Sequence, residues 1–178
     1  MINRRPIIGV MGSHENSWEE YANPVGELLA ERGFNMLTGC GEGVMTSVSK
    51  AFYEYPDREG VVIGIRPAVD YKGEQLSKEM FPNEYIDIPI ITPLSSKAQS
   101  DAMPFSRNLV NVMTSKALII LPGSHGTQNE VSLGIHYEKP MILFGPDNAF
   151  DKFPEEPLRA SDISHISQFL DDVFGEQE

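Results

Sequence analysis

The sequence predicts an α/β fold of the Rossmann-like type, an open parallel sheet with helices on both faces. The central observation is the run Ala117–Leu121, five consecutive apolar residues that Pro122-Gly123 and a helical stretch follow. A strand without polar alternation is typical of a parallel sheet, where both faces are covered. The same order of strand, glycine loop and helix occurs twice between residues 6 and 52, which indicates parallel strands joined by right-handed crossovers.

Each element is predicted from its apolar pattern. Short apolar runs bounded by glycine, proline or polar residues predict strands, and these are residues 6–11, 34–38, 61–65, 86–91, 117–121 and 141–144. Apolar residues at helical spacing predict helices over 18–32, 44–52, 105–113, 127–138 and 163–173. Residues 92–103 and 145–159 are predicted loops, and residues 70–84 are polar with no clear pattern.

Two helix starts depend on capping chemistry. Pro24 lies within the first predicted helix, so either the helix kinks there or Asn23 caps a shorter helix with Pro24 in its first turn. Ser161 is the predicted cap of the last helix, because serine favours that position.

Composition limits the class of protein. The 178 residues fit a single domain, 1–178, large enough to bury roughly 70 % of the surface of the unfolded chain. A net charge of −12 argues against nucleic acid as a partner, since that binding depends on Lys and Arg. The single cysteine, Cys40, excludes an internal disulfide and suits a reducing compartment. The sequence has no membrane span and no signal-peptide core, so we expect a cytoplasmic protein.

Ligands of such sheets bind at the carboxyl ends of the strands. Those ends carry Gly12–His14, Gly39–Gly43, Arg66 and Gly123–Thr127. The first amides of a helix lack internal partners and attract anions, and glycine lets a phosphate approach the backbone. We therefore expect a small phosphate-bearing ligand at Gly123–Thr127, where a buried strand, a tight turn and a helix start follow one another.

Two charged residues flank the central strand. Arg107 opens the preceding helix and Glu130 lies one turn into the following one, so both should reach the same sheet edge. Arg107 could hold a phosphate or ribose oxygen as a forked donor. Glu130 could accept from sugar hydroxyls, or stabilise the positive charge that develops when a glycosidic bond breaks.

Several of these residues also have a structural interpretation. Thr127 with Glu130 fits a capping box, and Arg107 fits a solvated helix start. Ser13 and His14 could simply close a turn. Cys40 is more typical of a small buried residue than of a nucleophile, because the sequence places no general base beside it.

The histidines and methionines add no further chemistry. His125 faces either ligand or solvent, and His136 and His165 are predicted on helix surfaces. No grouping has metal-ligand spacing, and the methionines are predicted in the core.

The stretch Pro122-Gly-Ser-His-Gly-Thr-Gln-Asn-Glu130 resembles the Pro-Gly-Gly-x-Gly-Thr-x-x-Glu motif of the lysine-decarboxylase-like superfamily. This superfamily includes the cytokinin-activating "lonely guy" phosphoribohydrolases and the molybdenum cofactor carrier proteins. In the hydrolases an upstream arginine and the final glutamate are catalytic, which corresponds to Arg107 and Glu130 here. Ser124 replaces the second glycine and His125 follows it, and a Cβ there changes how closely a ligand can approach. This departure favours a carrier, whereas the retained Arg107 and Glu130 favour a hydrolase.

Other stretches are similar to the carrier branch, among them residues 6–12, 37–45, 62–65, 87–92 and Arg107-Asn108. The resemblance implies a homo-oligomer, a dimer or tetramer, with Ile135 and Tyr137 on an interface helix. It also implies binding of the molybdenum cofactor, through its phosphate and pterin groups, for storage, protection or delivery. The alternatives are a nucleoside 5'-monophosphate phosphoribohydrolase of the cytokinin-activating type, with Arg107 and Glu130 catalytic, and a nucleotide-sensing module. The expected cofactor-binding residues are Gly12, Ser13, His14, Gly39, Gly41, Gly43, Arg107, Asn108, Gly123, Ser124, His125, Gly126, Thr127 and Glu130.

Overall fold

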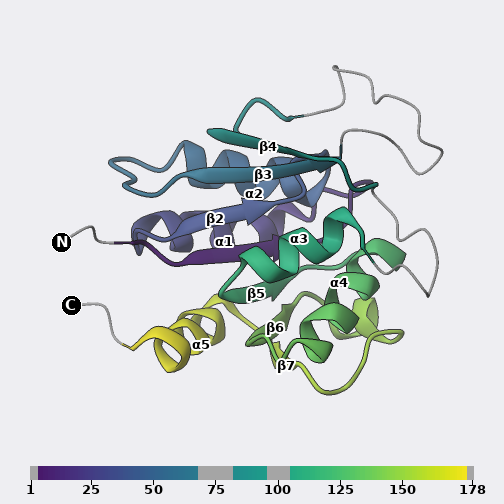
Figure 1. Ribbon diagram of the computed structural model, residues 1–178. Coiled ribbons are helices and arrows are strands. Elements are labelled where there is room, and N and C mark those ends of the chain that lie inside the picture. Colours follow the sequence, from purple (N-terminus) through teal and green to yellow (C-terminus); the bar gives the residue numbers. More distant parts are fainter. Residues whose placement is uncertain (1–3, 68–81, 96–104, 176–178) are drawn as a thin grey trace.

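The computed structural model describes residues 4–67, 82–95 and 105–175. Its seven strands form one sheet in the order β4-β3-β2-β1-β5-β6-β7, and every neighbouring pair is parallel (Figure 1). The strands are β1 (Ile7–Met11), β2 (Asn35–Thr38), β3 (Val62–Pro67), β4 (Ile88–Thr92), β5 (Ala117–Ile120), β6 (Met141–Phe144) and β7 (Leu158–Ala160). The predicted Rossmann-like parallel sheet is confirmed.

Helices cover both faces of the sheet, as predicted. Side chains of α1, α2 and α5 pack in one apolar cluster, and those of α3 and α4 pack in a second cluster on the opposite face. The helices are α1 (Glu19–Glu31), α2 (Val44–Tyr53), α3 (Arg107–Thr114), α4 (His125–His136) and α5 (Ile163–Phe174). None of the helices in the described residues is both long and apolar enough to cross a membrane.

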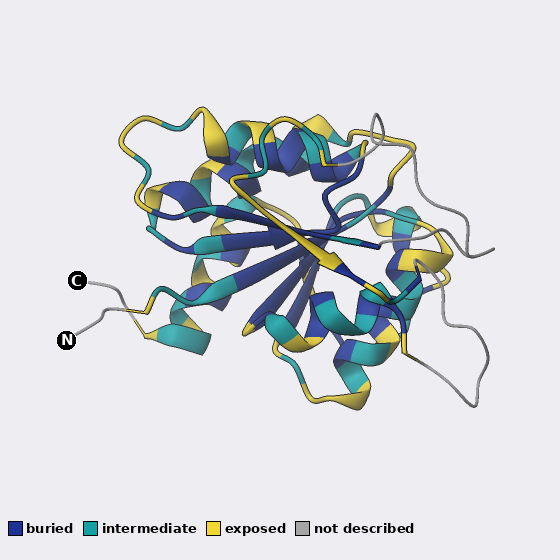
Figure 2. Ribbon diagram, turned by 45° about the horizontal axis from the view of Figure 1, so that its top comes forward, coloured by how far each residue is buried: buried dark blue, intermediate teal, exposed yellow. Residues whose placement is uncertain are grey.

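The central strand β5 is buried on both sides. Ala117 and Ile119 face the cluster of α1, α2 and α5, whereas Leu118 and Ile120 face the cluster of α3 and α4. All four are fully buried, and the strands are accordingly dark blue in the centre of Figure 2. The edge strand β4 differs, since only its last residue, Thr92, is buried.

The strand order reverses between β1 and β5. From β1 the chain adds β2, β3 and β4 outward on one side, and then β5, β6 and β7 on the other. The crossovers that leave this point diverge, and open parallel sheets bind their ligands at such a reversal, outside the carboxyl ends of the strands. The topology therefore places the candidate site at the ends of these two strands.

Helix α1 continues through Pro24, so the alternative in which Asn23 caps a shorter helix is wrong. The helix begins at Glu19, and Trp18 precedes it in the left-handed conformation (φ 46°). Proline removes one helix hydrogen bond. The missing hydrogen bond lies on the half-buried side of the helix, at Asn23 and Pro24. The flanking Ala22 and Val25 are buried in the core.

The predicted loop 145–159 contains a short 3-10 helix, η1 (Asp147–Phe150), and the beginning of β7. A three-residue strand is too short to show a pattern, and pairing with β6 defines it.

The cap of α5 is Asp162 rather than the predicted Ser161, since the Asp162 carboxylate accepts from the Ser164 amide at 2.8 Å. The Ser164 hydroxyl also donates to this carboxylate, and its hydrogen bond, followed by that of the amide, lowers the pKa of Asp162. Residues 70–81 of the polar segment 70–84 and residues 96–103 of the predicted loop 92–103 lie outside the described residues.

Close contact between α1 and α2 requires glycine at position 26. A Cβ there would lie 2.5 Å from the Val48 carbonyl oxygen and 2.9 Å from the Phe52 nitrogen. We predict that Gly26→Ala lowers the free energy of unfolding by about 1–3 kcal/mol, despite alanine's higher helix propensity. Urea unfolding measures this. The neighbouring exposed Glu27→Ala is the control, expected within about 0.5 kcal/mol of wild type; a stabilised Gly26→Ala would contradict the packing described.

Candidate functional site at the ends of β1 and β5

Three segments meet where β1 and β5 end. The Ser13 amide donates to the Pro122 carbonyl at 3.0 Å, which joins the loop after β1 to the loop after β5. The Val44 amide donates to the Ser13 carbonyl at 2.9 Å, which brings the start of α2 to the same point. The predicted loops at Gly12–Ser13, Gly43 and Gly123 are thus adjacent in the fold.

Glycine is required at two of these positions. Gly43 has φ +64°, and a Cβ on it would lie 2.4 Å from the Ser13 carbonyl oxygen. A Cβ on Gly123 would lie 2.1 Å from the Thr127 hydroxyl oxygen and 3.1 Å from the Ser13 nitrogen. A side chain would collide with backbone at position 43 and with the Thr127 side chain at position 123, so both glycines allow these loops to pack closely.

Helix α4 starts at His125, with its first turn open to solvent. Ser124 is extended at the N-cap position, and its side chain makes no capping hydrogen bond. Ser124, His125 and Gly126 are exposed. The first amides of such a helix have no internal acceptor, and the helix dipole favours an anion in front of them. The start of α4 therefore has the geometry expected for a phosphate.

The capping-box interpretation of Thr127 and Glu130 is wrong. Thr127 is buried inside the helix, because α4 begins two residues before it. The Glu130 carboxylate accepts from Asn111 Nδ2 on α3 at 3.0 Å. Neither Thr127 nor Glu130 therefore caps α4, and Glu130 instead connects α4 to α3.

Arg107 begins α3, as predicted, and reaches across to the end of β2. Its Nη1 donates to the Gly39 carbonyl at 2.9 Å, and a Cβ on Gly39 would lie 2.0 Å from the same nitrogen. Its Nε is buried and has no hydrogen-bond partner in the part of the chain that the structure describes. A buried donor without a partner is unusual. The solvated-helix interpretation of Arg107 is therefore wrong, and the arginine is anchored with donor capacity remaining.

Glu130 is almost fully buried, with 6 % of its surface exposed. Burial raises the pKa of its carboxyl, while the nearby Arg107 charge and the Asn111 hydrogen bond oppose that rise. Arg107 and Glu130 thus interact electrostatically from neighbouring helices, as expected from the sequence.

Asn108 and Asn111 hold α3 against α4. Asn108 Nδ2 donates to Asn129 Oδ1 at 3.1 Å and to the Gly126 carbonyl at 3.4 Å. Asn111 was not among the site residues predicted from the sequence. Its position three residues after Asn108 places both side chains on one helix face, which could have indicated it. The Asn111 Oδ1 atom is buried without a partner in the described residues.

Cys40 lies in the loop after β2 and is fully buried, with φ 55°. Burial raises the pKa of its thiol to about 11, although Arg107 and Arg66 oppose the rise. A neutral thiol is a poor nucleophile. The interpretation of Cys40 as a small buried residue therefore fits its environment.

Three predicted residues lie less centrally. His14 is exposed and faces Glu15, with Nε2 and Oε1 3.7 Å apart. His125 is exposed at the start of α4. The Gly41 carbonyl accepts from Thr46 and Asn83, so its backbone supports the loop.

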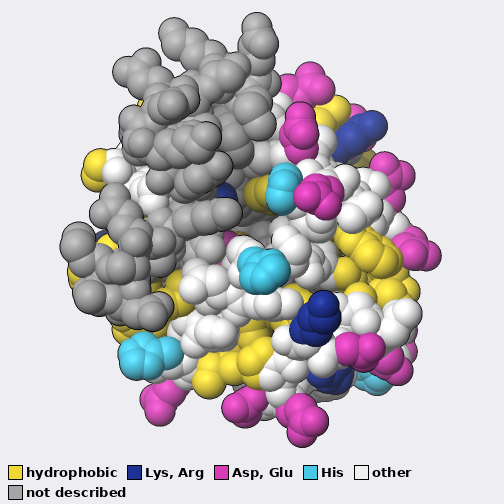
Figure 3. Space-filling model, turned by 90° about the vertical axis from the view of Figure 1, so that its right-hand side faces the viewer, with side chains coloured by type: hydrophobic (Ala, Val, Ile, Leu, Met, Phe, Trp, Pro, Cys, Tyr) yellow, Lys and Arg dark blue, Asp and Glu magenta, His cyan; other side chains and the backbone are white. Residues whose placement is uncertain are grey.

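Charge on the face at the strand ends is distributed unevenly. Figure 3 shows histidines and uncharged atoms across the middle of this face, with most Asp and Glu nearer its periphery. No cluster of three or more His, Cys, Asp or Glu suited to a metal ion occurs within residues 4–67, 82–95 and 105–175.

Comparison with known proteins assigns the chain to a family. The model of the SLOG cluster4 family matches residues 5–168. An uncharacterized protein of Archaeoglobus fulgidus is 31 % identical over 141 residues, which are 78 % of this chain and 80 % of that one. The chain belongs to the SLOG cluster4 family.

Two solved structures resemble this SLOG cluster4 protein over nearly its whole length. The molybdenum cofactor binding protein from the phototrophic bacterium Rippkaea orientalis is 28 % identical with a TM-score of 0.71, covering 96 % of this chain and 98 % of that one. The molybdenum cofactor carrier protein from Chlamydomonas reinhardtii is 29 % identical with a TM-score of 0.68, covering 94 % and 99 %. The relationship expected from the motif is confirmed.

The raised pKa of the buried Glu130 carboxyl predicts how the free energy of unfolding depends on pH. Its carboxyl ionises readily in the unfolded chain near the ordinary pKa of 4.5 but less readily when folded. Stability from this group is therefore fully present below pH 4.5 and is lost as the pH rises toward the raised pKa. Glutamine at this position cannot ionise. We therefore predict that the free energy of unfolding of Glu130→Gln, minus that of wild type, increases as the pH rises above 4.5.

Urea unfolding of both proteins across this pH range measures the margin. Groups that titrate alike in wild type and in Glu130→Gln contribute equally to both free energies of unfolding, so their contributions cancel in the difference. A margin that does not change with pH would show that Glu130 titrates alike in the folded and unfolded chains.

Proposed function

We propose that this SLOG cluster4 protein binds the molybdenum cofactor, a phosphate-bearing pterin, for storage, protection or delivery. The observation that carries the proposal is likeness over more than nine-tenths of the chain to a molybdenum cofactor binding protein and to a molybdenum cofactor carrier protein. The local chemistry supports it, because the converging loops offer donors to an anion.

The start of α4 is the proposed phosphate position. Gly123, Ser124, His125, Gly126 and Thr127 would surround the phosphate, with backbone amides as donors. The exposure of the first turn leaves those amides accessible, and the buried Arg107 Nε supplies a nearby donor. These features fit an anion in an otherwise acidic protein.

The pterin part would lie along the ends of β1 and β2. Residues of these ends and of α3 are proposed to contact it: Gly12, Ser13, His14, Gly39, Gly41, Gly43, Asn108 and Glu130. Two features support this arrangement. Asn108 and Glu130 are held by hydrogen bonds between α3 and α4, and Arg107 is anchored to the Gly39 carbonyl.

The phosphoribohydrolase alternative is less well supported. A carboxylate stabilises the cationic transition state of glycosidic cleavage only when it is ionised. Burial raises the Glu130 pKa, which favours the neutral carboxyl. A carrier needs only ground-state binding, whereas a hydrolase must bind the transition state more tightly. The environment of Glu130 thus suits binding better than cleavage.

Paired assays separate the two functions. We expect no release of base from purine nucleoside monophosphates, and a longer half-life of the molybdenum cofactor in air with the protein than without it. Bovine serum albumin at equal mass is the control for non-specific protection. Clear turnover together with no protection would contradict the carrier function and favour the hydrolase.

Arg107 should contribute strongly to cofactor binding. We predict that Arg107→Ala weakens binding by about 1.5–3 kcal/mol, because a charge-assisted contact to the phosphate is lost. Equilibrium dialysis under anaerobic conditions measures the change. Arg4→Ala, an exposed arginine before β1, removes the same charge and should bind as wild type does. Equal weakening in both variants would point to net charge instead.

We further propose self-association through the adjoining ends of α3 and α4. Tyr137 and Met113 leave 41 % and 48 % of their surface exposed there, and Lys139 Nζ donates to the Met113 carbonyl between them at 3.2 Å. Ile135, the other residue expected at the interface, packs against the protein's own core.

A cytoplasmic location is also proposed, since a reducing compartment suits the free buried thiol of Cys40.

Sedimentation velocity tests the assembly. We predict a dimer or a dimer of dimers, and weaker association of Tyr137→Ser, which removes exposed apolar surface. Tyr53→Ser, which removes a similarly exposed tyrosine on α2, is the matched control. A monomer at all concentrations would reject the proposal.

A further inference from the structure

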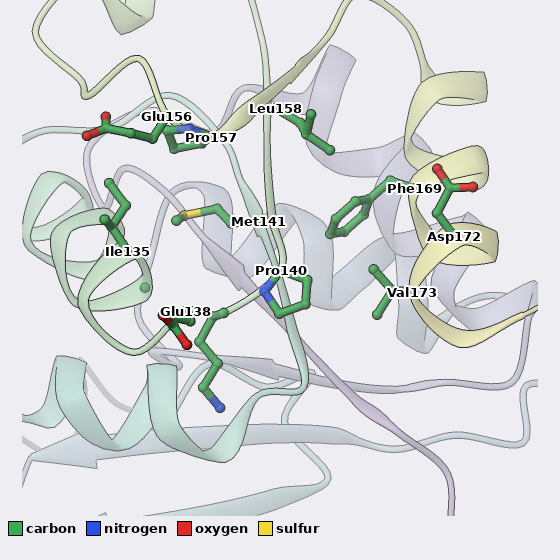
Figure 4. Close-up of a pocket in the computed structure, with 12 residues that line it drawn as sticks. Ile135, Glu138, Pro140, Met141, Glu156, Pro157, Leu158, Phe169, Asp172 and Val173 are labelled. Carbon is green, nitrogen blue, oxygen red and sulfur yellow. The ribbon is translucent and has the colours of Figure 1, made fainter.

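A second concave region lies at the opposite edge of the sheet from the candidate site. A cavity of about 410 Å³ opens between the C-terminal end of α4, the starts of β6 and β7, and α5 (Figure 4). Because these strands begin here, the cavity lies at their amino ends. It has no part in the cofactor binding proposed above.

The floor of the cavity is apolar. Met141 and Phe169 are nearly buried, and Ile135 and Val173 are half-buried beside them. Leu158 lines the same cavity with 59 % of its surface exposed. A cavity that leaves a leucine this exposed is open enough to admit a bulky side chain from another molecule.

The rim of the cavity is acidic. Glu138, Glu156 and Asp172 line it from three different segments, and all three are exposed. Lys139 also lines it, but its Nζ donates to the Ser115 carbonyl at 2.7 Å and to the Met113 carbonyl at 3.2 Å. Its ammonium keeps its charge but is held by carbonyls at the end of α3. Three carboxylates therefore stand against one ammonium, and the rim is acidic on balance.

We propose that this cavity is a docking site for a partner protein, which inserts a bulky apolar side chain flanked by Lys or Arg. Apolar anchors in pockets supply most of the energy of such contacts, and complementary charge selects the partner. A second copy of this chain fits the cavity poorly, because a twofold contact centred on it would bring its carboxylates near their counterparts in a protein of net charge −12. The self-association proposed above is centred instead on Tyr137 and Met113, which do not line the cavity. Nucleic acid is disfavoured for the same electrostatic reason.

Docking here would leave the candidate site accessible. Helix α4 begins at the proposed phosphate position and ends at the cavity, so the two regions lie at opposite ends of one helix. A partner could therefore bind without covering the ends of β1 and β5.

Selection from a random peptide library on the full-length protein tests the proposal. We expect enriched peptides to combine a large apolar residue with Lys or Arg. Fluorescence anisotropy of the synthesised peptides should show binding about tenfold weaker to Glu156→Lys than to wild type, since attraction becomes repulsion. Leu158→Ser should also weaken binding, by loss of apolar contact.

Glu155→Lys is the matched control, because it changes the net charge equally at an exposed neighbour that does not line the cavity. It should retain most of the wild-type affinity. Failure to enrich basic and apolar peptides, or equal effects of Glu156→Lys and Glu155→Lys, would overturn the proposal. Circular dichroism verifies that each variant is folded.

Discussion

The contact between the ends of β1 and β5 is the constraint on which the rest of the site depends. One hydrogen bond, from the Ser13 amide to the Pro122 carbonyl, extends the pairing of the two strands into their loops. It fixes the position of the glycine turn before α4, and the neighbouring bond from Val44 to the Ser13 carbonyl fixes the start of α2. The strand order reverses at this point, and these bonds determine which backbone groups lie at the strand ends.

A second set of contacts holds the polar side chains in place. Arg107 is anchored to the carbonyl of Gly39, and Asn111 holds the carboxyl of Glu130. Burying such groups requires that most of their hydrogen bonds be made within the protein. Arg107 Nε is a buried donor without a partner among the described residues, and this is what supports the proposal that Arg107 contacts the ligand.

Much of the fold was predictable because buried parallel strands have a strong signal. The run Ala117–Leu121 and the glycine loops predicted the parallel sheet and the edge at which the candidate site is placed. Caps and short elements were less predictable: Asp162 replaces Ser161 as a cap, and β7 has three residues and no pattern of its own. The bridge from Asn111 to Glu130 joins residues 19 positions apart, so it depends on helix packing that no local pattern records. The cavity beside α5 likewise arises from three segments distant in sequence.

The most direct test of cofactor binding is native mass spectrometry of the protein purified without oxygen. Binding at the ends of β1 and β5 predicts an adduct with the isotope pattern of molybdenum and the mass of a phosphate-bearing pterin, retained by Arg4→Ala and lost or much reduced in Arg107→Ala. A nucleoside monophosphate in its place, or a molybdenum adduct equally abundant in both variants, would contradict the account.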